Sequence, residues 1–182
     1  VTGVQTCALP IFILQPDGRI LVGGGFTSFN NLSRYGIARL NADGTLDAGF
    51  DVGAGVNGSV YAVVLQPDGK VLIAGEFTAF NNITRYRVAR LNADGSLDDT
   101  FNPGTGPDDT VYAVGLQADG KVVIGGSFRQ VNGQYFNNVA RLDTNGLVDA
   151  AWQPVAGADG NVYAITVQPD GRSLIGGAFR SY

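Results

Sequence analysis

The chain has 182 residues, of which 45% are hydrophobic and 15% charged, and its formal net charge is −4. This composition is typical of a folded globular protein, and no apolar run reaches the length of a membrane span. The acidic balance is spread along the chain and excludes non-specific nucleic-acid binding, which requires a basic face. Glycine is abundant, at 27 residues, as in turn-rich all-β proteins.

The sequence contains no histidine, and its single cysteine is Cys7. A Ser-His-Asp triad, a Cys-His pair and a His-ligated zinc therefore cannot be built from this chain. The sequence gives no reason to expect a cofactor or a metal. It predicts a protein that is not an enzyme.

The first eleven residues, VTGVQTCALPI, fit no part of the pattern that follows. They resemble a translated sequencing-adapter oligonucleotide, whereas a signal peptide would begin with a basic segment, which is absent here. We therefore interpret residues 1–11, with Cys7, as a non-native artefact. We expect residues 12–182 to be a fragment, because they open and close within a repeat.

The rest of the chain spells one stretch four times. It reads QPDGRILVGGGF at Gln15–Phe26, QPDGKVLIAGEF at Gln66–Phe77, QADGKVVIGGSF at Gln117–Phe128 and QPDGRSLIGGAF at Gln168–Phe179. The spacing is 51 residues each time, which defines repeats 15–65, 66–116, 117–167 and a partial copy, 168–182. Periods of about 40–50 residues with several strands per unit are typical of propeller blades. No 3.6-residue pattern indicates helices.

Each unit is expected to form four antiparallel strands. In the second unit these are Val60–Gln66, Lys70–Phe77, Tyr86–Asn92 and Ser96–Phe101. Asp-Gly pairs after the first and third strands predict tight hairpin turns. The first two strands are almost continuously apolar, as in strands covered on both faces, and the fourth is polar like an outer strand. The predicted fold is all-β, a partial β-propeller of four-stranded antiparallel blades.

The repeat is similar to the delta-60 repeat family, a bacterial kelch-like β-propeller repeat. The resemblance rests on V-Y-A-V-x-[LV]-Q-P-D-G-[KR]-x-L-[IV]-G-G-x-F-T and [IV]-A-R-L-N-A-D-G-[ST]-L-D-x-x-F, and it covers residues 12–182. It implies an exported protein, extracellular or at the cell surface of a bacterium. Three complete units cannot close a ring of four to eight blades, so we expect the remaining blades of the full-length chain as packing partners.

The antiparallel order places the tight Asp-Gly turns on one face of the disc and the longer segments on the other. The longer segments are 27–34, 78–85 and 129–136, with the interblade links 51–59, 102–110 and 153–161. Binding residues are concentrated in loops of this kind. The long-loop face is therefore the predicted recognition surface.

The first two long loops repeat amide, guanidinium and aromatic groups that suit a glycan or a peptide backbone. The candidate ligand-binding residues are Asn30, Asn31, Arg34, Tyr35, Asn81, Asn82, Arg85 and Tyr86. The third copy departs from this set. A solvated polar loop without a ligand is the alternative interpretation.

Two acidic features allow a functional or a structural interpretation. The turn N-x-D-G-x-x-D, as at Asn92–Asp98, has part of a calcium-loop pattern, but Asx side chains that accept local N–H groups also explain it. Glu76 is the only glutamate in the chain. It could act as a general acid or base, or be a solvated carboxylate.

Two recurring series are interpreted as structural. The arginines of the A-R-L triplet are expected to pair with the aspartates eight residues later rather than to face a ligand. These pairs are Arg39 with Asp47, Arg90 with Asp98, and Arg141 with Asp149. The side chains of the series Tyr61, Tyr112 and Tyr163 are predicted to pack in the core and between blades.

These features predict a non-catalytic interaction or scaffold module whose ligand is a protein or a glycan. One alternative is a fragment of a glycosidase- or lactonase-like propeller enzyme with its catalytic groups on missing blades. Another is a calcium-stabilised structural repeat. An enzyme needs one blade with residues that the others lack, and in the sequence only Glu76 hints at this.

Overall fold

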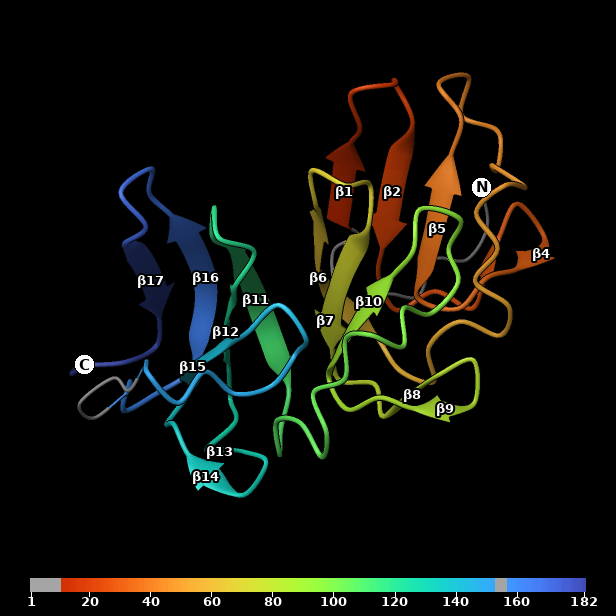
Figure 1. Ribbon diagram of the computed structural model, residues 1–182. Coiled ribbons are helices and arrows are strands. Elements are labelled where there is room, and N and C mark those ends of the chain that lie inside the picture. The colour runs from red at the N-terminus through yellow and green to blue at the C-terminus, as the bar shows by residue number, and fades with distance from the viewer. Residues whose placement is uncertain (1–10, 153–156) are drawn as a thin grey trace.

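The computed structural model describes residues 11–152 and 157–182, and every element in these ranges is a β-strand (Figure 1). Ile11 is the first residue of β1. Residues 1–10 lie outside the described residues, so the interpretation of residues 1–11 as an artefact stays a prediction. The described ranges contain no helix with the length and hydrophobicity of a membrane span.

The longer strands form antiparallel sheets, each of which is one blade. In blade 1 they are β1 (Ile11–Leu14), β2 (Ile20–Gly23) and β5 (Ile37–Leu40). In blade 2 they are β6 (Val60–Leu65), β7 (Val71–Gly75) and β10 (Val88–Leu91). In blade 3 they are β11 (Val111–Leu116), β12 (Val122–Gly126) and β15 (Val139–Leu142). In blade 4 they are β16 (Val162–Val167) and β17 (Ser173–Gly177).

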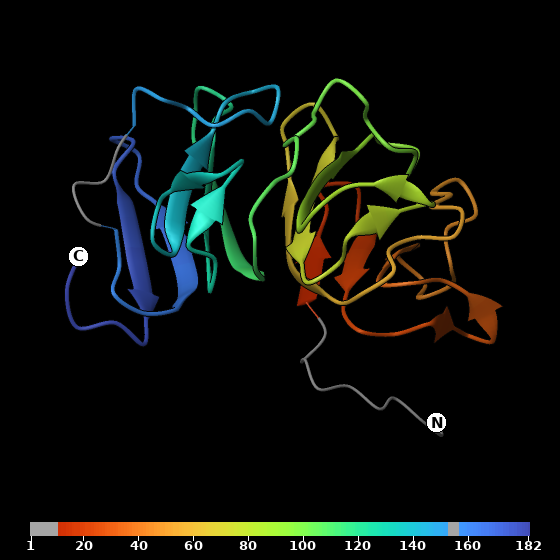
Figure 2. The ribbon, with the colours of Figure 1, turned by 90° about the horizontal axis from the view of Figure 1, so that it is seen from below.

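The blades follow one another in chain order, from the red to the blue end of the chain (Figure 2). The first strands of consecutive blades lie next to each other, β1 beside β6, β6 beside β11, and β11 beside β16. The second strand of each complete blade is central, because it pairs with both the first and the third. This arrangement confirms the all-β propeller prediction.

The predicted fourth strand is wrong in its extent. In blade 2 the segment Ser96–Phe101 contributes only one bridge, between Leu91 and Leu97. The reason is local hydrogen bonding: the Asp98 carboxylate accepts the Thr100 N–H at 3.0 Å, and the Phe101 N–H returns to the Asp98 carbonyl at 3.2 Å. The backbone therefore turns out of the ladder, and each complete blade has three strands and one bridge.

The long segments between second and third strands, which the sequence predicts to be loops, contain small hairpins. These are β3 (Ser28–Phe29) with β4 (Leu32–Ser33), β8 (Ala79–Phe80) with β9 (Ile83–Thr84), and β13 (Gln130–Val131) with β14 (Gln134–Tyr135). In Figure 1 the β8–β9 and β13–β14 hairpins lie at the bottom, opposite the Asp-Gly turns at the top. The interblade links 51–59 and 102–110 run over the hairpin of the next blade, as the bridges between Val56 and Phe80 and between Pro107 and Val131 show.

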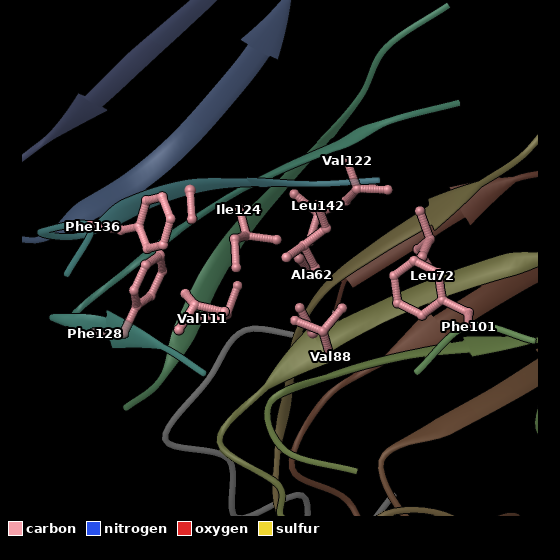
Figure 3. Close-up of a cluster of buried hydrophobic side chains, with 14 residues drawn as sticks. Ala62, Leu72, Val88, Phe101, Val111, Val122, Ile124, Phe128, Phe136 and Leu142 are labelled. Carbon is pink, nitrogen blue, oxygen red and sulfur yellow. The ribbon is translucent and has the colours of Figure 1, made fainter. Parts of the chain in front are cut away.

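The hydrophobic core lies between consecutive blades. One cluster joins Leu72, Val88 and Phe101 of blade 2 to side chains of blade 3, including Ala140 and Leu142 (Figure 3). An equivalent cluster joins blades 1 and 2. Each fully buried large apolar side chain contributes about 1.5–3 kcal/mol, so neighbouring blades stabilise one another.

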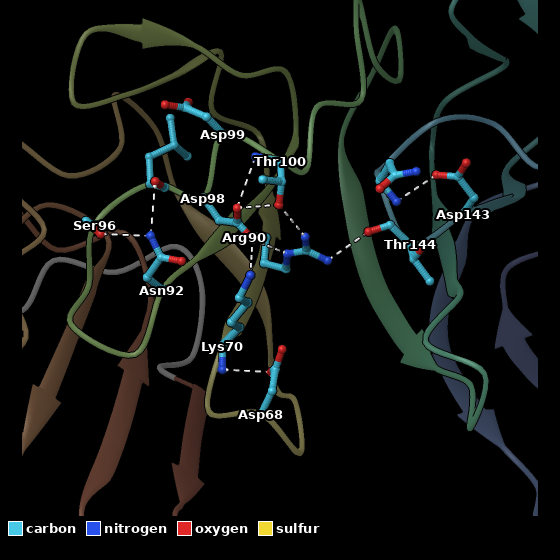
Figure 4. A network of polar contacts seen from close by, with 12 residues as sticks. Asp68, Lys70, Arg90, Asn92, Ser96, Asp98, Asp99, Thr100, Asp143 and Thr144 are labelled. Carbon is cyan, nitrogen blue, oxygen red and sulfur yellow. Dashed lines mark hydrogen bonds and ion pairs between the residues drawn. The ribbon is translucent and has the colours of Figure 1, made fainter.

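A buried ion pair also joins consecutive blades, as the sequence predicts for the A-R-L arginines. Arg90 Nε donates to Asp98 Oδ2 at 2.6 Å, while Arg90 Nη1 donates to the Thr144 carbonyl of blade 3 at 2.9 Å (Figure 4). Lys70 Nζ adds a third contact to the Asp98 carboxylate at 2.8 Å. The guanidinium also lies over the Phe101 ring, 4.9 Å from its centroid.

The same pair recurs in the blades on either side. Arg39 contacts Asp47 at 2.7 Å and reaches the Ala93 carbonyl of blade 2 at 2.7 Å. Arg141 contacts Asp149 at 2.9 Å through Nε. The predicted structural role of the three arginines is therefore confirmed.

A β-bulge interrupts the first strand of blades 2, 3 and 4 at the same position. In blade 2 the pairing passes from Val60 with Gly75 to Ala62 with Ala74, which leaves Tyr61 unpaired. Gly75 permits this geometry, because a Cβ there would lie 1.9 Å from the Ser59 carbonyl oxygen. The glycine that ends the second strand of blades 2, 3 and 4 (Gly75, Gly126 and Gly177) is thus required by close backbone approach.

We predict that Gly75→Ala destabilises the protein by about 3 kcal/mol, because the new methyl group meets rigid backbone. Gly176→Ala is the matched control, since its Cβ would meet no atom nearer than 3.9 Å. Urea unfolding followed by far-UV circular dichroism measures both. Equal midpoints for the two variants would contradict the steric role of Gly75.

We predict that Asp98→Asn lowers the free energy of unfolding at pH 7 by about 3–5 kcal/mol, because it leaves Arg90 buried beside a neutral group. Burial of Asp98 opposes its ionisation, but hydrogen bonds from Lys70, Thr100 and Arg90 outweigh this and hold its pKa well below the ordinary value. The stabilisation is therefore complete above about pH 4 and is lost as the pH falls toward the folded-state pKa.

Thermal unfolding from pH 7 to pH 2 tests this expectation. The wild type should lose more stability in acid than Asp98→Asn does. The exposed control Asp68→Asn keeps an acceptor for the Lys70 N–H and should stay within about 0.5 kcal/mol of the wild type. Parallel pH profiles for wild type and Asp98→Asn would show that the pair does not set acid stability.

Candidate functional site

The predicted binding asparagines form the turns of two small hairpins on the long-loop face. Asn30 and Asn31 have φ of 48° and 62°, and Asn81 and Asn82 have φ of 47° and 63°. Two consecutive positive φ values are those of a type I′ hairpin turn, which asparagine tolerates well. Backbone geometry therefore explains these residues structurally, and their binding of a ligand stays a prediction.

The other predicted residues of this set are partly engaged by the structure. Arg85 is 7% exposed, and its Nη2 donates to Asp99 Oδ1 at 2.9 Å. Arg34 donates to the neighbouring Ser33 carbonyl at 2.8 Å. Tyr35 is 40% exposed and Tyr86 is half-buried. Each set of four lies within its own blade.

A row of three tyrosines lies where the first strands of blades 2, 3 and 4 begin. The ring centroids of Tyr61 and Tyr112 are 5.7 Å apart, and those of Tyr112 and Tyr163 are 5.3 Å apart. Tyr163 is 52% exposed, and the other two are half-buried. These residues connect blades, as predicted, but their assignment to the core is wrong. Each is the bulged residue of its strand, and a bulge re-aims the side chain.

A group of polar residues adjoins the first tyrosine of this row. The Tyr61 hydroxyl donates to Glu76 Oε2 at 2.9 Å, and Arg87 Nη1 donates to the backbone carbonyls of Glu76 and Phe77. Asp109, at the start of blade 3, lies within electrostatic reach of Arg87. We call Tyr61, Glu76, Arg87 and Asp109 the charged cluster.

The charged cluster holds hydrogen-bond donors and an anion at neutral pH. Burial, together with the hydrogen bond to Glu76, raises the pKa of the Tyr61 hydroxyl, so it remains a donor. The Thr110 N–H lowers the pKa of Asp109, and the charge of Arg87 adds to this effect against partial burial. The cluster can therefore both donate to and accept from a polar ligand.

The charged cluster breaks the symmetry of the repeat. The counterparts of Glu76 are Gly25, Ser127 and Ala178, those of Arg87 are Gly36 and Asn138, and those of Asp109 are Gly58 and Gly160. Arg87 has φ of 63°, where Gly36 has 73°. The left-handed region costs a non-glycine residue about 1 kcal/mol, and such strain is concentrated at functional sites.

Sequence reasoning singled out Glu76 but missed Arg87 and Asp109. Their signal is the departure from glycine at aligned repeat positions, since both replace residues without a charge. Only the fold shows that Arg87 contacts the Glu76 backbone and that its charge acts on Asp109. Glu76 follows β7, Arg87 precedes its partner β10, and the interblade link carries Asp109.

The corresponding position between blades 3 and 4 is a cavity. It has a volume of about 420 Å³ and is lined by polar residues that include Ser127, Asn138 and Gly160. These are the counterparts of Glu76, Arg87 and Asp109. The same interblade position on the long-loop face therefore carries a charged surface at one boundary and an open cavity at the next.

The acidic turns use their oxygens within the chain. Asp43 Oδ1 accepts the Thr45 N–H at 2.9 Å, and Asp94 Oδ1 accepts the Ser96 N–H at 3.0 Å. The interpretation of these turns as Asx turns is confirmed. In residues 11–152 and 157–182 no three His, Cys, Asp or Glu residues are grouped to hold a metal ion.

The successive antiparallel sheets and the constant repeat define this chain as part of a β-propeller. Residues 15–50, 66–101 and 117–151 match the family described as "Domain of unknown function (DUF5122) beta-propeller". The matched residues make up more than half of the chain, so the chain belongs to this family. No curated protein matches it.

Solved structures share the fold at low identity. The WD40 β-propeller domain of Doa1 is 16% identical, with a TM-score of 0.48 over 96% of this chain and 62% of that chain. The PQQ-bound aldose sugar dehydrogenase from Streptomyces coelicolor is 15% identical, with a TM-score of 0.55 over 94% of this chain and 58% of that chain. This chain thus spans less than two thirds of either structure. At such identities the second similarity supports the propeller fold alone.

We predict that Arg87→Gly changes the free energy of unfolding by less than about 1 kcal/mol, because relief of the left-handed strain offsets the loss of the hydrogen bonds to the Glu76 and Phe77 carbonyls. Asn138→Gly is the matched control. It has the same backbone conformation, but its Nδ2 donates to the Ala158 carbonyl at 2.7 Å in a buried position. It should therefore destabilise by about 1 kcal/mol. Chemical denaturation compares the two, and a strongly destabilised Arg87→Gly would give Arg87 a structural role.

Proposed function

We propose that this chain is a non-catalytic interaction module of an exported or cell-surface bacterial protein, which binds a glycan through the tyrosine row and the charged cluster. The carrying observation is that three adjoining, partly exposed tyrosine rings end at a hydroxyl–carboxylate pair. Sugars present an apolar face and a rim of hydroxyls. Aromatic rings match the first, and carboxylate and guanidinium groups match the second.

The resemblance to delta-60, kelch-like repeats supports the bacterial and exported parts of this proposal. The long-loop hairpins extend the proposed surface outward from the tyrosine row. Their contribution would come from Asn30, Asn31, Arg34, Tyr35, Asn81, Asn82, Arg85 and Tyr86. A protein ligand on this same face is the second form of the interaction proposal.

A propeller enzyme is the alternative function, and the asymmetry of the charged cluster favours it. Glu76 and Asp109 are two carboxylates that the other blades lack at these positions, and paired carboxylates perform glycoside hydrolysis. A lactonase-like activity belongs to the same alternative. No cluster of carboxylates in the ranges that the structure describes supports the alternative of a calcium-stabilised repeat.

Calorimetric titration with soluble glucose- and N-acetylglucosamine-based hexasaccharides tests the proposal. We predict that Tyr112→Ala weakens binding at least about tenfold, because the central ring of the row supplies stacking. Leu147→Ala removes a side chain that is 52% exposed beside the tight turn on the opposite face, and it should bind like the wild type. No binding of any oligosaccharide, or equal losses in both variants, would contradict a glycan site at the row.

The same mixtures of protein and hexasaccharide distinguish the non-catalytic module from the enzyme alternative. New reducing ends that are released by the wild type and lost in Glu76→Gln would assign hydrolysis to the charged cluster. Binding without product supports the non-catalytic module.

A further inference from the structure

The cavity between blades 3 and 4, which we call the interblade cavity, lies on the long-loop face next to the proposed site. Its volume of about 420 Å³ falls within the range of about 300–1,000 Å³ that is typical of small-molecule sites. Among the described residues its walls come from blade 3 and the link 157–161, and only Ser181 lies beyond β17. The cavity is thus a feature of the boundary between two blades.

The interblade cavity adjoins the last tyrosine of the row. Asn161 lines the cavity, and its Nδ2 donates to the Tyr163 hydroxyl at 3.1 Å. Because the hydroxyl accepts this hydrogen bond, its own proton is available to a ligand. Tyr163 is 52% exposed, so a glycan that stacks on the row can continue into the cavity.

The tyrosine row therefore differs in chemistry at its two ends. At one end the Tyr61 hydroxyl donates to the Glu76 carboxylate, so a ligand meets a negative charge there. At the other end a ligand meets donors, because the Tyr163 hydroxyl has a free proton and Arg129 lines the adjoining cavity. A glycan with an acidic group thus fits the row in one direction, with that group at the Tyr163 end.

Arg129 is the charged group of the cavity that lacks a counter-ion. Its backbone is held on both sides, since the N–H donates to Asp108 Oδ1 at 2.9 Å and the carbonyl accepts the Phe136 N–H at 2.9 Å. Within residues 11–152 and 157–182 its guanidinium makes no hydrogen bond or ion pair. A guanidinium in this state can donate two parallel hydrogen bonds to a carboxylate.

The carboxylates near the cavity already accept hydrogen bonds from the chain itself. Asp159 Oδ1 accepts two backbone N–H groups, at 2.6 and 3.1 Å. Asp108 Oδ1 also accepts two, at 2.9 and 3.0 Å. Asp109 accepts one at 2.7 Å, and the charge of Arg87 stabilises its ionised form. Arg129 is thus the uncompensated charge that a ligand in the cavity meets.

We propose that the interblade cavity binds the carboxylate-bearing sugar of an acidic glycan, with Arg129 as its counter-ion, an assignment that rests on the proposed glycan-binding function. The uronic acid enters the cavity beside Tyr163, and the neighbouring sugars stack along the row toward Tyr61. The boundary between blades 2 and 3 does not suit the same group, because Glu76 and Asp109 place carboxylates at the equivalent positions.

A hexasaccharide of alternating glucuronic acid and N-acetylglucosamine is the probe. The same hexasaccharide with its carboxyl groups reduced to alcohols is the matched control ligand. In calorimetric titrations of the 182-residue chain, we expect the acidic form to bind at least about tenfold more tightly at low ionic strength, because hydrogen bonds between charged groups are about twice as strong as neutral ones. The difference should shrink at about 0.5 M salt, which screens the charges.

The variant Arg129→Gln tests where the carboxylate binds. It should weaken binding of the acidic form at least about tenfold and leave the affinity for the reduced form unchanged, which a purely structural role of Arg129 would not produce. Arg172→Gln is the matched control. It removes the same charge from a side chain that is 82% exposed in a tight turn on the opposite face, and it should bind both forms like the wild type.

Three results would count against the proposal, and they are distinguishable. Equal affinity for the acidic and reduced forms would overturn it and leave the proposed glycan-binding function standing. Selectivity for the acidic form that Arg129→Gln does not reduce would overturn the cavity as the site of the carboxylate. If neither form binds, the proposed function fails as well.

Discussion

The buried Arg–Asp pair is the interaction on which the arrangement of blades depends. The Arg90 side chain is 10% exposed and the Asp98 side chain 5%, so neither charge is well solvated without the other. The same guanidinium reaches a backbone carbonyl of the next blade, which fixes one blade against another. The same Asp98 carboxylate accepts the Thr100 N–H, and this local hydrogen bond turns the chain out of the ladder after Leu97 and leaves the fourth strand as one bridge. One aspartate thus contributes both to the width of a blade and to its packing.

The bulge in each first strand connects the fold to the proposed function. A glycine at the end of the second strand allows the backbone to approach closely, and the bulged tyrosine is thereby directed toward the tyrosines of neighbouring blades. The regular repeat places these rings in a row. The bulge therefore contributes both to the packing of the blades and to the proposed binding surface, and the tyrosine row would be lost if the bulge were removed.

The proposed function rests on departures from the repeat. The repeated positions are explained by packing, capping and turns, whereas Glu76, Arg87 and Asp109 replace small or neutral residues of other blades. Arg87 also occupies a backbone conformation that suits glycine. Strained backbone of this kind is concentrated at functional sites, which is why the proposed site includes Arg87. The cavity at the next boundary shows that this interblade position varies while the frame remains constant.

The sequence by itself determined the all-β class, the positions of the first three long strands of a blade, the Asp-Gly turns and the long-loop face. These are local properties, set by period, alternation and turn chemistry and repeated in register. The A-R-L pairing was also predictable, because both partners recur at one spacing. Tertiary structure decided that the tyrosines leave the core, since a bulge depends on contact between a strand and a distant link. It also decided that Arg87 contacts the Glu76 backbone and that its charge acts on Asp109, because strand pairing and blade packing join segments whose proximity no local pattern encodes.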